Sequence, residues 1–104
     1  MIMSVYHTES TEQLFWAIAS IQNEEEARAL MEDLCTIKEI QDMAQRLDTA
    51  ILLSQGYSYQ KIAERIKVST ATISRVNRAL TYGANGYQTV IARMNETEKK
   101  DDNQ

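Results

Sequence analysis

The chain has 104 residues, one cysteine, no proline and a formal net charge of −4. This length fits one domain, and the single Cys35 cannot form an internal disulfide, so nothing requires an oxidising compartment. No apolar run approaches the roughly 18 residues of a membrane span, and the N-terminal sequence lacks a signal-peptide pattern. We therefore expect a cytoplasmic one-domain protein with no membrane partner.

The negative total hides an uneven distribution of charge. Residues 1–56 contain ten acidic and three basic side chains, a net charge of −7. Residues 57–82 contain five basic side chains and one acidic side chain, a net charge of +4. Attraction to phosphates acts within about a Debye length, roughly 8–10 Å, so local charge matters more than the total. The composition therefore leaves nucleic acid open as a partner, and residues 57–82 are the segment that suits it.

The first half of the chain predicts three helices. Residues 1–10 are expected to be frayed or disordered, and a short amphipathic helix opens at Thr11. Asn23 is a suitable N-cap for a second helix, whose first turn holds three glutamates where the helix dipole favours negative charge. Thr36–Glu39 has the pattern of a capping box and starts the longest helix. Gly56 is expected to end that helix in a left-handed conformation.

These three helices, residues 11–56, carry more large apolar side chains than so short a chain can bury. The side chains in question are Leu14, Phe15, Trp16, Leu30, Met31 and Leu34. We interpret the segment as a dimerisation element, with a purely intramolecular core as the alternative. The absence of proline permits an all-α fold throughout.

Residues 57–82 have the pattern of a helix-turn-helix, with Ser58–Ile66 as the support helix and Thr70–Thr81 as the recognition helix. Two short helices that cross steeply need a small residue at their contact, which Ala63 supplies, and apolar residues toward a shared core. The residues spaced for that core are Ile62, Ile66, Val68, Ile73, Val76 and Leu80. Lys67 is expected in the left-handed position of the turn, at a cost of roughly 1 kcal/mol relative to glycine. The alternative is an ordinary pair of helices unrelated to DNA.

The outward face of the predicted recognition helix carries short hydrogen-bonding side chains and two arginines, without an acid. Small side chains let the helix approach base edges in the major groove, and guanidinium groups suit phosphates or guanine. The predicted DNA contacts are Ser58, Tyr59 and Gln60 to the backbone, Ser69, Thr70, Ala71, Thr72 and Ser74 to base edges, and the cationic Lys67, Arg75 and Arg78. The expected partner is a double-stranded, two-fold-symmetric operator.

Residues 84–95 predict a final helix, and the polar residues 96–104 are expected to form a disordered tail. Residues 11–95 would then be a single all-α domain. The sequence has no nucleophile–base pair, metal-spaced cluster or glycine-rich phosphate loop, so we expect neither an enzyme nor a cofactor. A protein-interaction adaptor that keeps the helix-turn-helix shape is the competing class, and the overall acidity favours it slightly.

Four stretches resemble the Trp repressor-like superfamily, and more closely its small bacterial YerC/YecD branch. They are Asp33–Thr36, Glu39–Leu47, Ser69–Arg75 and Leu80–Gly83, and the resemblance covers about residues 10–94. It implies six helices and an interlocked homodimer built from the N-terminal helices. It also implies transcriptional control, most simply repression, at an operator with two-fold symmetry, and hence a place at the nucleoid when bound.

The resemblance further implies a ligand pocket, and here the sequence departs from the Trp repressor. Arg46, Arg75 and Thr36 fall on positions that hold bound tryptophan, whereas Val76 matches a glycine beside the indole and Ala79 matches a serine near the amino group. Valine would occupy the volume of the indole, and alanine removes a partner of the charged amine. We therefore expect that free L-tryptophan is not the effector. A repressor responsive to a tryptophan-like molecule stays open as an alternative, as does a surface ion pair for Arg46.

Overall fold

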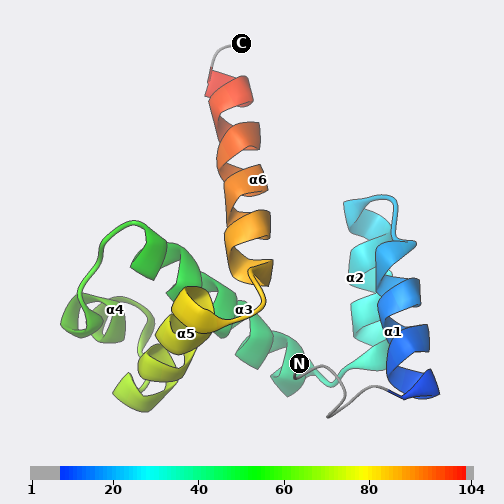
Figure 1. The fold of residues 1–104 in the computed structure, drawn as a ribbon, viewed down its shortest axis with the longest axis horizontal. Helices are drawn as coiled ribbons and strands as arrows, with labels where there is room; N and C mark the ends of the chain where they lie inside the picture. The colour runs from blue at the N-terminus through cyan, green and yellow to red at the C-terminus, as the bar shows by residue number, and fades with distance from the viewer. Residues whose placement is uncertain (1–7, 103–104) are drawn as a thin grey trace. The chain divides into compact units, whose positions relative to one another are not determined.

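The computed structural model describes residues 8–102, with side chains through residue 97. The described residues form helices and no strand: α1 (Glu9–Ala19), α2 (Glu24–Leu34), α3 (Ile37–Ser54), α4 (Tyr59–Ile66), α5 (Thr70–Tyr82) and α6 (Gly86–Asp102) (Figure 1). The predicted all-α fold of about six helices is confirmed. The chain divides into two compact units, Met1–Ile40 and Gln41–Gln104. No helix in the described range is long and apolar enough to cross a membrane.

α1 begins earlier than its sequence pattern predicts. The Thr8 hydroxyl accepts a hydrogen bond from the backbone N–H of Thr11 at 3.2 Å, and the Thr11 hydroxyl accepts one from the Thr8 N–H at 2.9 Å. This reciprocal box starts the helix at Glu9, with threonine in the place that glutamate or glutamine usually takes. The frayed segment expected over residues 1–10 is thus wrong for its last three residues, and residues 1–7 lie outside the described residues.

Asn23 and Thr36 cap α2 and α3 as predicted. The Asn23 side chain accepts a hydrogen bond from the Glu26 N–H at 2.9 Å. At the start of α3, the Thr36 hydroxyl accepts from the Glu39 N–H at 3.1 Å, and the Glu39 carboxylate accepts from the Thr36 N–H at 2.8 Å. The bond from the Thr36 N–H favours the ionised carboxylate of Glu39 and is the largest cause of its lowered pKa, and a side-chain hydrogen bond with Thr36 lowers that pKa further.

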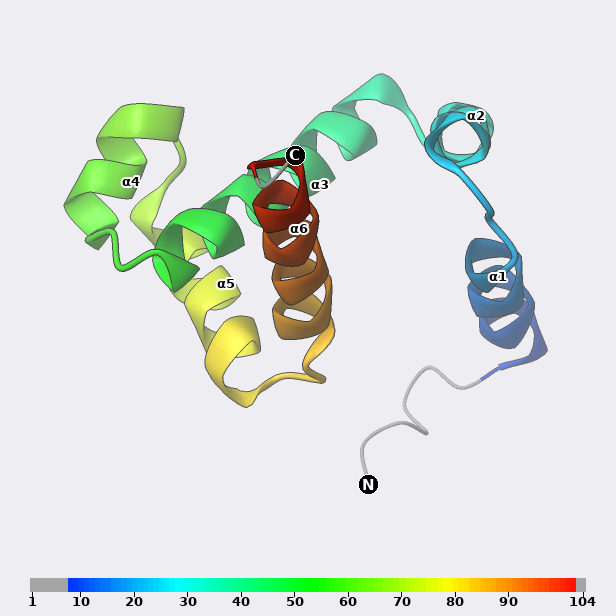
Figure 2. The same ribbon diagram turned by 90° about the horizontal axis from the view of Figure 1, so that it is seen from above.

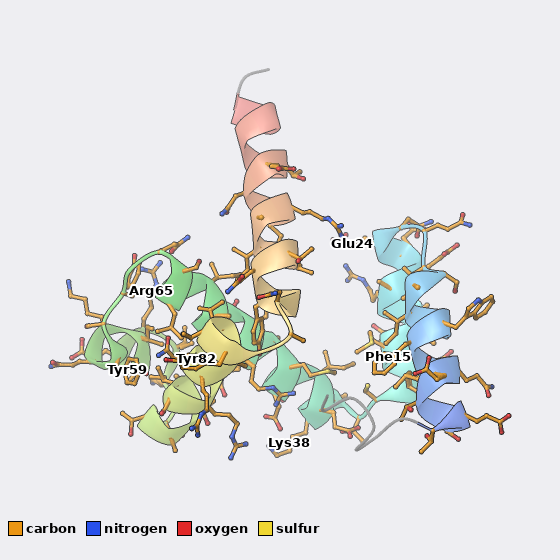
Figure 3. All side chains as sticks on the ribbon, in the orientation of Figure 1. Phe15, Glu24, Lys38, Tyr59, Arg65 and Tyr82 are labelled. Carbon is orange, nitrogen blue, oxygen red and sulfur yellow. The ribbon has the colours of Figure 1, made fainter. Side chains whose placement is uncertain are left out.

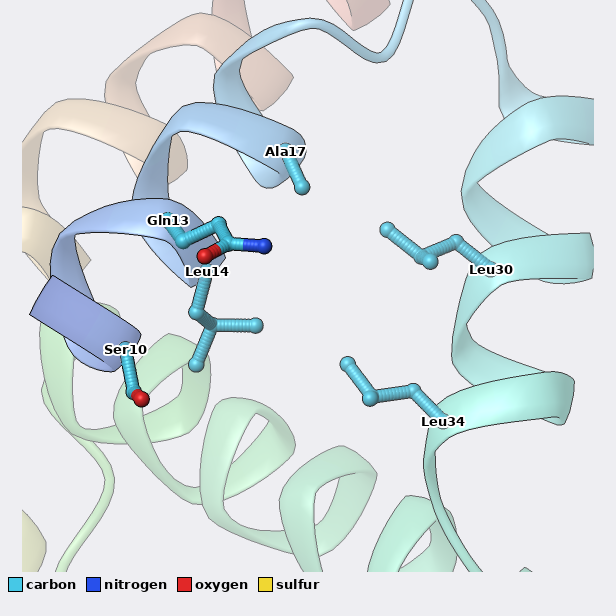
Figure 4. Close-up of a pocket in the computed structure, with 6 residues that line it drawn as sticks. All are labelled: Ser10, Gln13, Leu14, Ala17, Leu30 and Leu34. Carbon is cyan, nitrogen blue, oxygen red and sulfur yellow. The ribbon is translucent and has the colours of Figure 1, made fainter.

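Among the residues that the structure describes, α1 and α2 of the first unit, here called the α1–α2 unit, form no buried hydrophobic core. No side chain of either helix is buried, and Trp16 and Leu34 are 73% and 54% exposed. An open hollow of about 310 Å³ lies between the two helices (Figure 4). It is lined by Ser10, Gln13, Leu14, Ala17, Leu30 and Leu34. Contiguous apolar surface of this kind is normally covered by a further element or partner.

The second unit contains two apolar clusters that share α3 and α5. Figure 2 shows the ribbons of the helices that contribute to them, α3 to α6. The first, which we name the helix-turn-helix core, consists of Leu52, Ile62, Val68 and Ile73, with Ala63 and Ile66 packed against it. The second, the α6 cluster, consists of Ala50, Val76 and Ile91. Four of the six residues predicted to face the core are buried, whereas Ile66 and Leu80 are only partly buried. The recognition helix α5 therefore packs on α3 and α4 on one side and on α3 and α6 on the other.

The end of α3 follows the sequence prediction. Gly56 has a left-handed backbone with φ +89°, and the N–H of Tyr57 donates to the carbonyl of Leu52 at 3.1 Å. This bond satisfies a carbonyl that the end of the helix would otherwise leave unpaired. The chain then turns directly into α4.

α6 is longer than predicted. It begins at Gly86 and runs to Asp102, whereas the sequence pattern predicted a helix over residues 84–95 followed by a disordered tail over residues 96–104. Residues 96–102 are helical, which corrects that expectation, and residues 103–104 lie outside the described range. The correction has a local cause, because this stretch is rich in glutamate and lysine, which have high helix propensity. The spacing of apolar residues, from which the end of the helix was predicted, carries no information on the helix propensity of polar residues.

Candidate nucleic-acid interface

α4 and α5 are each fixed at their first turn by a serine. The Ser58 hydroxyl accepts a hydrogen bond from the Lys61 N–H at 3.2 Å, and the Ser69 hydroxyl accepts one from the Thr72 N–H at 3.1 Å. Both serines have extended backbones, as N-cap residues do. The predicted caps are confirmed, and they set the first residues of α5 on one rigid turn.

The turn between the two helices is built on Lys67. Its φ of 51° and ψ of 46° place it in the left-handed region, as predicted, and its N–H donates to the Ala63 carbonyl at 3.0 Å. This backbone conformation costs a residue with a Cβ roughly 1–2 kcal/mol. The exposed lysine thus sits three residues before α5 at a local energetic cost.

The outward face of α5 has the composition that major-groove entry requires. Thr70, Ala71, Ser74, Arg75 and Arg78 are exposed. Within the part of the chain that the structure describes, no carboxylate lies within ion-pair distance of either arginine. Both guanidinium groups are therefore uncompensated by the protein itself, one helical turn apart on the same face.

Ser69 and Thr72 are less available than the other residues expected to read bases. Thr72 is only partly exposed, and its hydroxyl accepts a hydrogen bond from the Ser69 hydroxyl at 3.0 Å. The Ser69 oxygen in turn accepts the capping bond from the Thr72 N–H. Their hydroxyls are thus mainly occupied in holding the first turn of α5, although each lies at the end of the helix that would face DNA.

The three residues predicted to touch the DNA backbone lie at the start of α4. Ser58, Tyr59 and Gln60 are exposed, Tyr59 by 38% (Figure 3). A hollow of about 390 Å³ adjoins Ser58, and Lys61 contributes to its lining. Lys61 is thus a further cation at the predicted backbone contact, which the sequence reasoning counted only in the charge of the segment.

Arg65 is the other residue that the sequence reasoning did not select. Its guanidinium donates to the Tyr57 hydroxyl at 3.0 Å and lies 5.4 Å from the centroid of the Tyr57 ring. The two residues are eight positions apart, with Tyr57 before the N-cap of α4 and Arg65 in its last turn, so the contact joins the helix to the segment that precedes it. The contact holds a positive charge in one orientation on the surface of α4 (Figure 3).

The five positions of the expected effector pocket have different environments. Thr36 belongs to the first unit, where its hydroxyl caps α3, while Arg46 and Arg75 are exposed in the second. Val76 is 2% exposed and belongs to the α6 cluster. Ala79 lines an open apolar hollow of about 470 Å³ together with Leu47, Ala84, Gly86, Tyr87 and Val90. The valine therefore fills space between helices, whereas the alanine borders an apolar surface.

Known proteins resemble this chain in both sequence and structure. Residues 9–95 match the family described as Trp repressor protein. The chain is 48% identical over 87 residues to the uncharacterized protein YerC of Bacillus subtilis (strain 168). This alignment covers 84% of each chain. A crystal structure from Staphylococcus aureus, whose description as a Trp repressor is provisional, is 41% identical in sequence and superposes with a TM-score of 0.83. The match covers 91% of this chain and 95% of that chain. A crystal structure of a TrpR-like protein from Eubacterium eligens is 48% identical, with a TM-score of 0.79, covering 85% and 91%. The chain belongs to the Trp repressor protein family.

Proposed function

We propose that this protein is a sequence-specific, double-stranded DNA-binding transcriptional regulator, most simply a repressor, whose α5 enters the major groove. The observation that carries the proposal is the outward face of α5, with small residues at its N-terminal end and the uncompensated Arg75 and Arg78 beyond them. The partial positive charge of a helix N-terminus adds to the attraction for phosphates. Membership of a family of regulators supports this class over an enzyme.

The contacts follow from the side chains that the two helices expose. Thr70, Ala71 and Ser74 face base edges, with Ser69 and Thr72 at the helix start contributing through water or through their remaining hydrogen-bonding capacity. The backbone is contacted by Ser58, Tyr59 and Gln60, and phosphates are neutralised by Lys67, Arg75 and Arg78. The DNA lies in the bacterial cytoplasm, which is therefore where the protein acts.

The protein acts as a homodimer in this proposal. The α1–α2 unit buries none of its own side chains, and the second unit leaves the apolar hollow beside Ala79 open. Two such incomplete faces in one short chain are what a second copy can cover. Two recognition helices would then read half-sites about one helical turn, roughly 34 Å, apart.

Free L-tryptophan is not the effector in this proposal. An indole beside α5 would need the space that the Val76 side chain occupies in the α6 cluster. Ala79 offers no hydrogen-bond acceptor to a charged amine. Isothermal titration with L-tryptophan should therefore give no heat of binding under conditions where the protein binds DNA.

The test is DNA selected in vitro from a random library, followed by affinity measurement at stated salt. The wild-type protein should enrich a two-fold-symmetric site. Replacing both Arg75 and Arg78 by alanine should weaken binding to that site at least a hundredfold, because a dimer loses four phosphate or guanine contacts. The control is Arg28→Ala, which removes one positive charge per chain from the acidic helix α2 and should leave affinity unchanged. Equal losses in both variants, or no enriched site, would reject the proposal.

The second candidate is an adaptor that binds another protein. The acidic, apolar α1–α2 unit favours it, since Phe15 and Trp16 are 47% and 73% exposed. An adaptor contact on that unit would survive the double arginine replacement, which should abolish DNA binding, and would be weakened by Trp16→Ala.

A further inference from the structure

The recognition helix α5 is tied to neighbouring helices at its middle and near its end, and the end of α4 that precedes it is tied to α3. Before its N-terminus, the Gln45 side-chain amide of α3 donates to the carbonyl of Ile66, the last residue of α4, at 3.3 Å. Near its C-terminus, the Gln88 amide of α6 donates to the carbonyl of Leu80 at 2.6 Å. Both donors come from helices outside the helix-turn-helix.

The middle tie is Val76. This side chain is 2% exposed and packs with Ala50 of α3, which is 0% exposed, and Ile91 of α6, which is 5% exposed. One methyl-bearing side chain thus joins three helices at the centre of α5. On the opposite side, Ile73 fixes the same helix in the helix-turn-helix core.

These contacts bear directly on regulation. A recognition helix that moves relative to its support binds DNA with an affinity reduced by the fraction of molecules in the competent arrangement. A small molecule can raise affinity only where that fraction is low, by binding the competent arrangement preferentially. A helix already held at its middle and near its end, with the end of α4 before it also fixed, leaves little for such a molecule to gain.

We infer that Val76, Gln45 and Gln88 are positioning residues that hold α5 in its DNA-binding arrangement, so that operator binding requires no small-molecule effector. The inference rests on the proposed DNA-binding function and specifies its regulation. It extends beyond the exclusion of L-tryptophan, because it applies to any activating ligand. Regulation would then follow the amount of the protein rather than a metabolite.

The first experiment uses the full-length protein, unfolded and refolded to remove bound molecules, with its in vitro selected DNA. Affinity should change less than twofold on addition of L-tryptophan, indole or a low-molecular-weight extract of bacterial cells. A tenfold or larger gain with any of these additions overturns the inference and leaves the DNA-binding proposal intact. Failure to bind selected DNA both with and without additions rejects the DNA-binding proposal itself.

The second experiment removes the ties. Val76→Ala should weaken DNA affinity about tenfold and raise hydrogen exchange selectively over α5, at a temperature where circular dichroism shows the variant folded. Its salt dependence should equal that of the wild type, because the same phosphates are still contacted. Met94→Ala is the control, since Met94 is 41% exposed on α6 and lies outside both the α6 cluster and the hollow beside Ala79.

Gln88→Ala keeps the inference testable if Val76→Ala fails to fold, because Gln88 is exposed and its loss leaves no cavity. It should weaken DNA affinity about threefold with an unchanged salt dependence and raise hydrogen exchange at the end of α5. Gln41→Ala, an exposed glutamine on α3, is its control and should bind as the wild type does. Wild-type affinity together with wild-type exchange in the Gln88→Ala protein would overturn the inference.

Discussion

Replacing Lys67 by glycine should raise stability and lower DNA affinity at the same time. The lysine backbone has φ 51° and ψ 46°, a conformation that costs a residue with a Cβ roughly 1–2 kcal/mol and costs glycine nothing. Glycine loses about 0.5–1 kcal/mol more backbone entropy on folding, so the net gain is about 0.5–1 kcal/mol. For a domain of this size the melting temperature should rise by about 4 °C.

The effect on DNA arises from charge alone. If each Lys67 neutralises one phosphate, a dimer loses two contacts, and the slope of log affinity against log salt should become less steep by about 1.8. Lys67→Ala separates the two effects, because it removes the charge and keeps the strained backbone. It should show the shallower slope without the rise in melting temperature.

Thermal unfolding followed by circular dichroism and anisotropy titrations from 50 to 300 mM salt measure both quantities. A Lys67→Gly protein that melts below the wild type would refute the strain argument. A Lys67→Ala protein with the wild-type salt slope would refute the phosphate contact.

Three further outcomes follow from the packing and capping contacts. The pKa of Glu39 is lowered by its bond to a backbone N–H, so its contribution to stability is complete above the ordinary carboxyl value of about 4.3 and is lost as the pH falls through the lower folded-state value. Urea unfolding from pH 7 to pH 3 should therefore show a smaller decline for Glu39→Gln than for the wild type. Ile73→Ala empties a site that is 0% exposed and should cost about 2–5 kcal/mol in the same assay. Gly83→Ala should lower the melting temperature because its Cβ would collide with the Ala79 carbonyl, whereas Gly86→Ala, with no atom within 4 Å of the new Cβ, should not.

Structural features that depend on only three or four neighbouring residues were predicted well from the sequence. Asn23, Ser58 and Ser69 cap helices because a short polar side chain reaches an N–H two or three residues on, whatever the distant chain does. Lys67 was placed in the left-handed region for the same reason, since the spacing of two helices around a short turn leaves one position for it. The outward face of α5 then followed from helical periodicity.

Two kinds of feature escaped that reasoning. The early start of α1 depends on a pair of threonines in place of the usual threonine and glutamate, and the long α6 depends on propensity without an apolar stripe. The bond between Arg65 and Tyr57 and the ties from Gln45 and Gln88 join a helix to another helix or to the segment that precedes it. Such contacts are set by how helices pack, which only the folded chain determines.

The apolar residues also divide into those whose environment only the folded chain reveals and those whose sequence pattern was sufficient. The sequence placed Val76 both in the core and in the effector pocket of relatives, because an alignment position does not reveal which helix a side chain meets. In the folded chain it meets Ala50 and Ile91. The exposed Trp16 and Leu34 of the α1–α2 unit, by contrast, retain the property that suggested a dimerisation element, since none of the described residues of that unit buries them.

The most direct test of the central claim is a salt titration of wild-type binding to its selected DNA. Lys67, Arg75 and Arg78 are three exposed cations on or beside α5, and a dimer presents six. With each neutralised phosphate contributing about −0.9, log affinity should fall against log salt with a slope of about −5. A slope near zero would contradict the account, because the basic face of α5 would then not be meeting DNA.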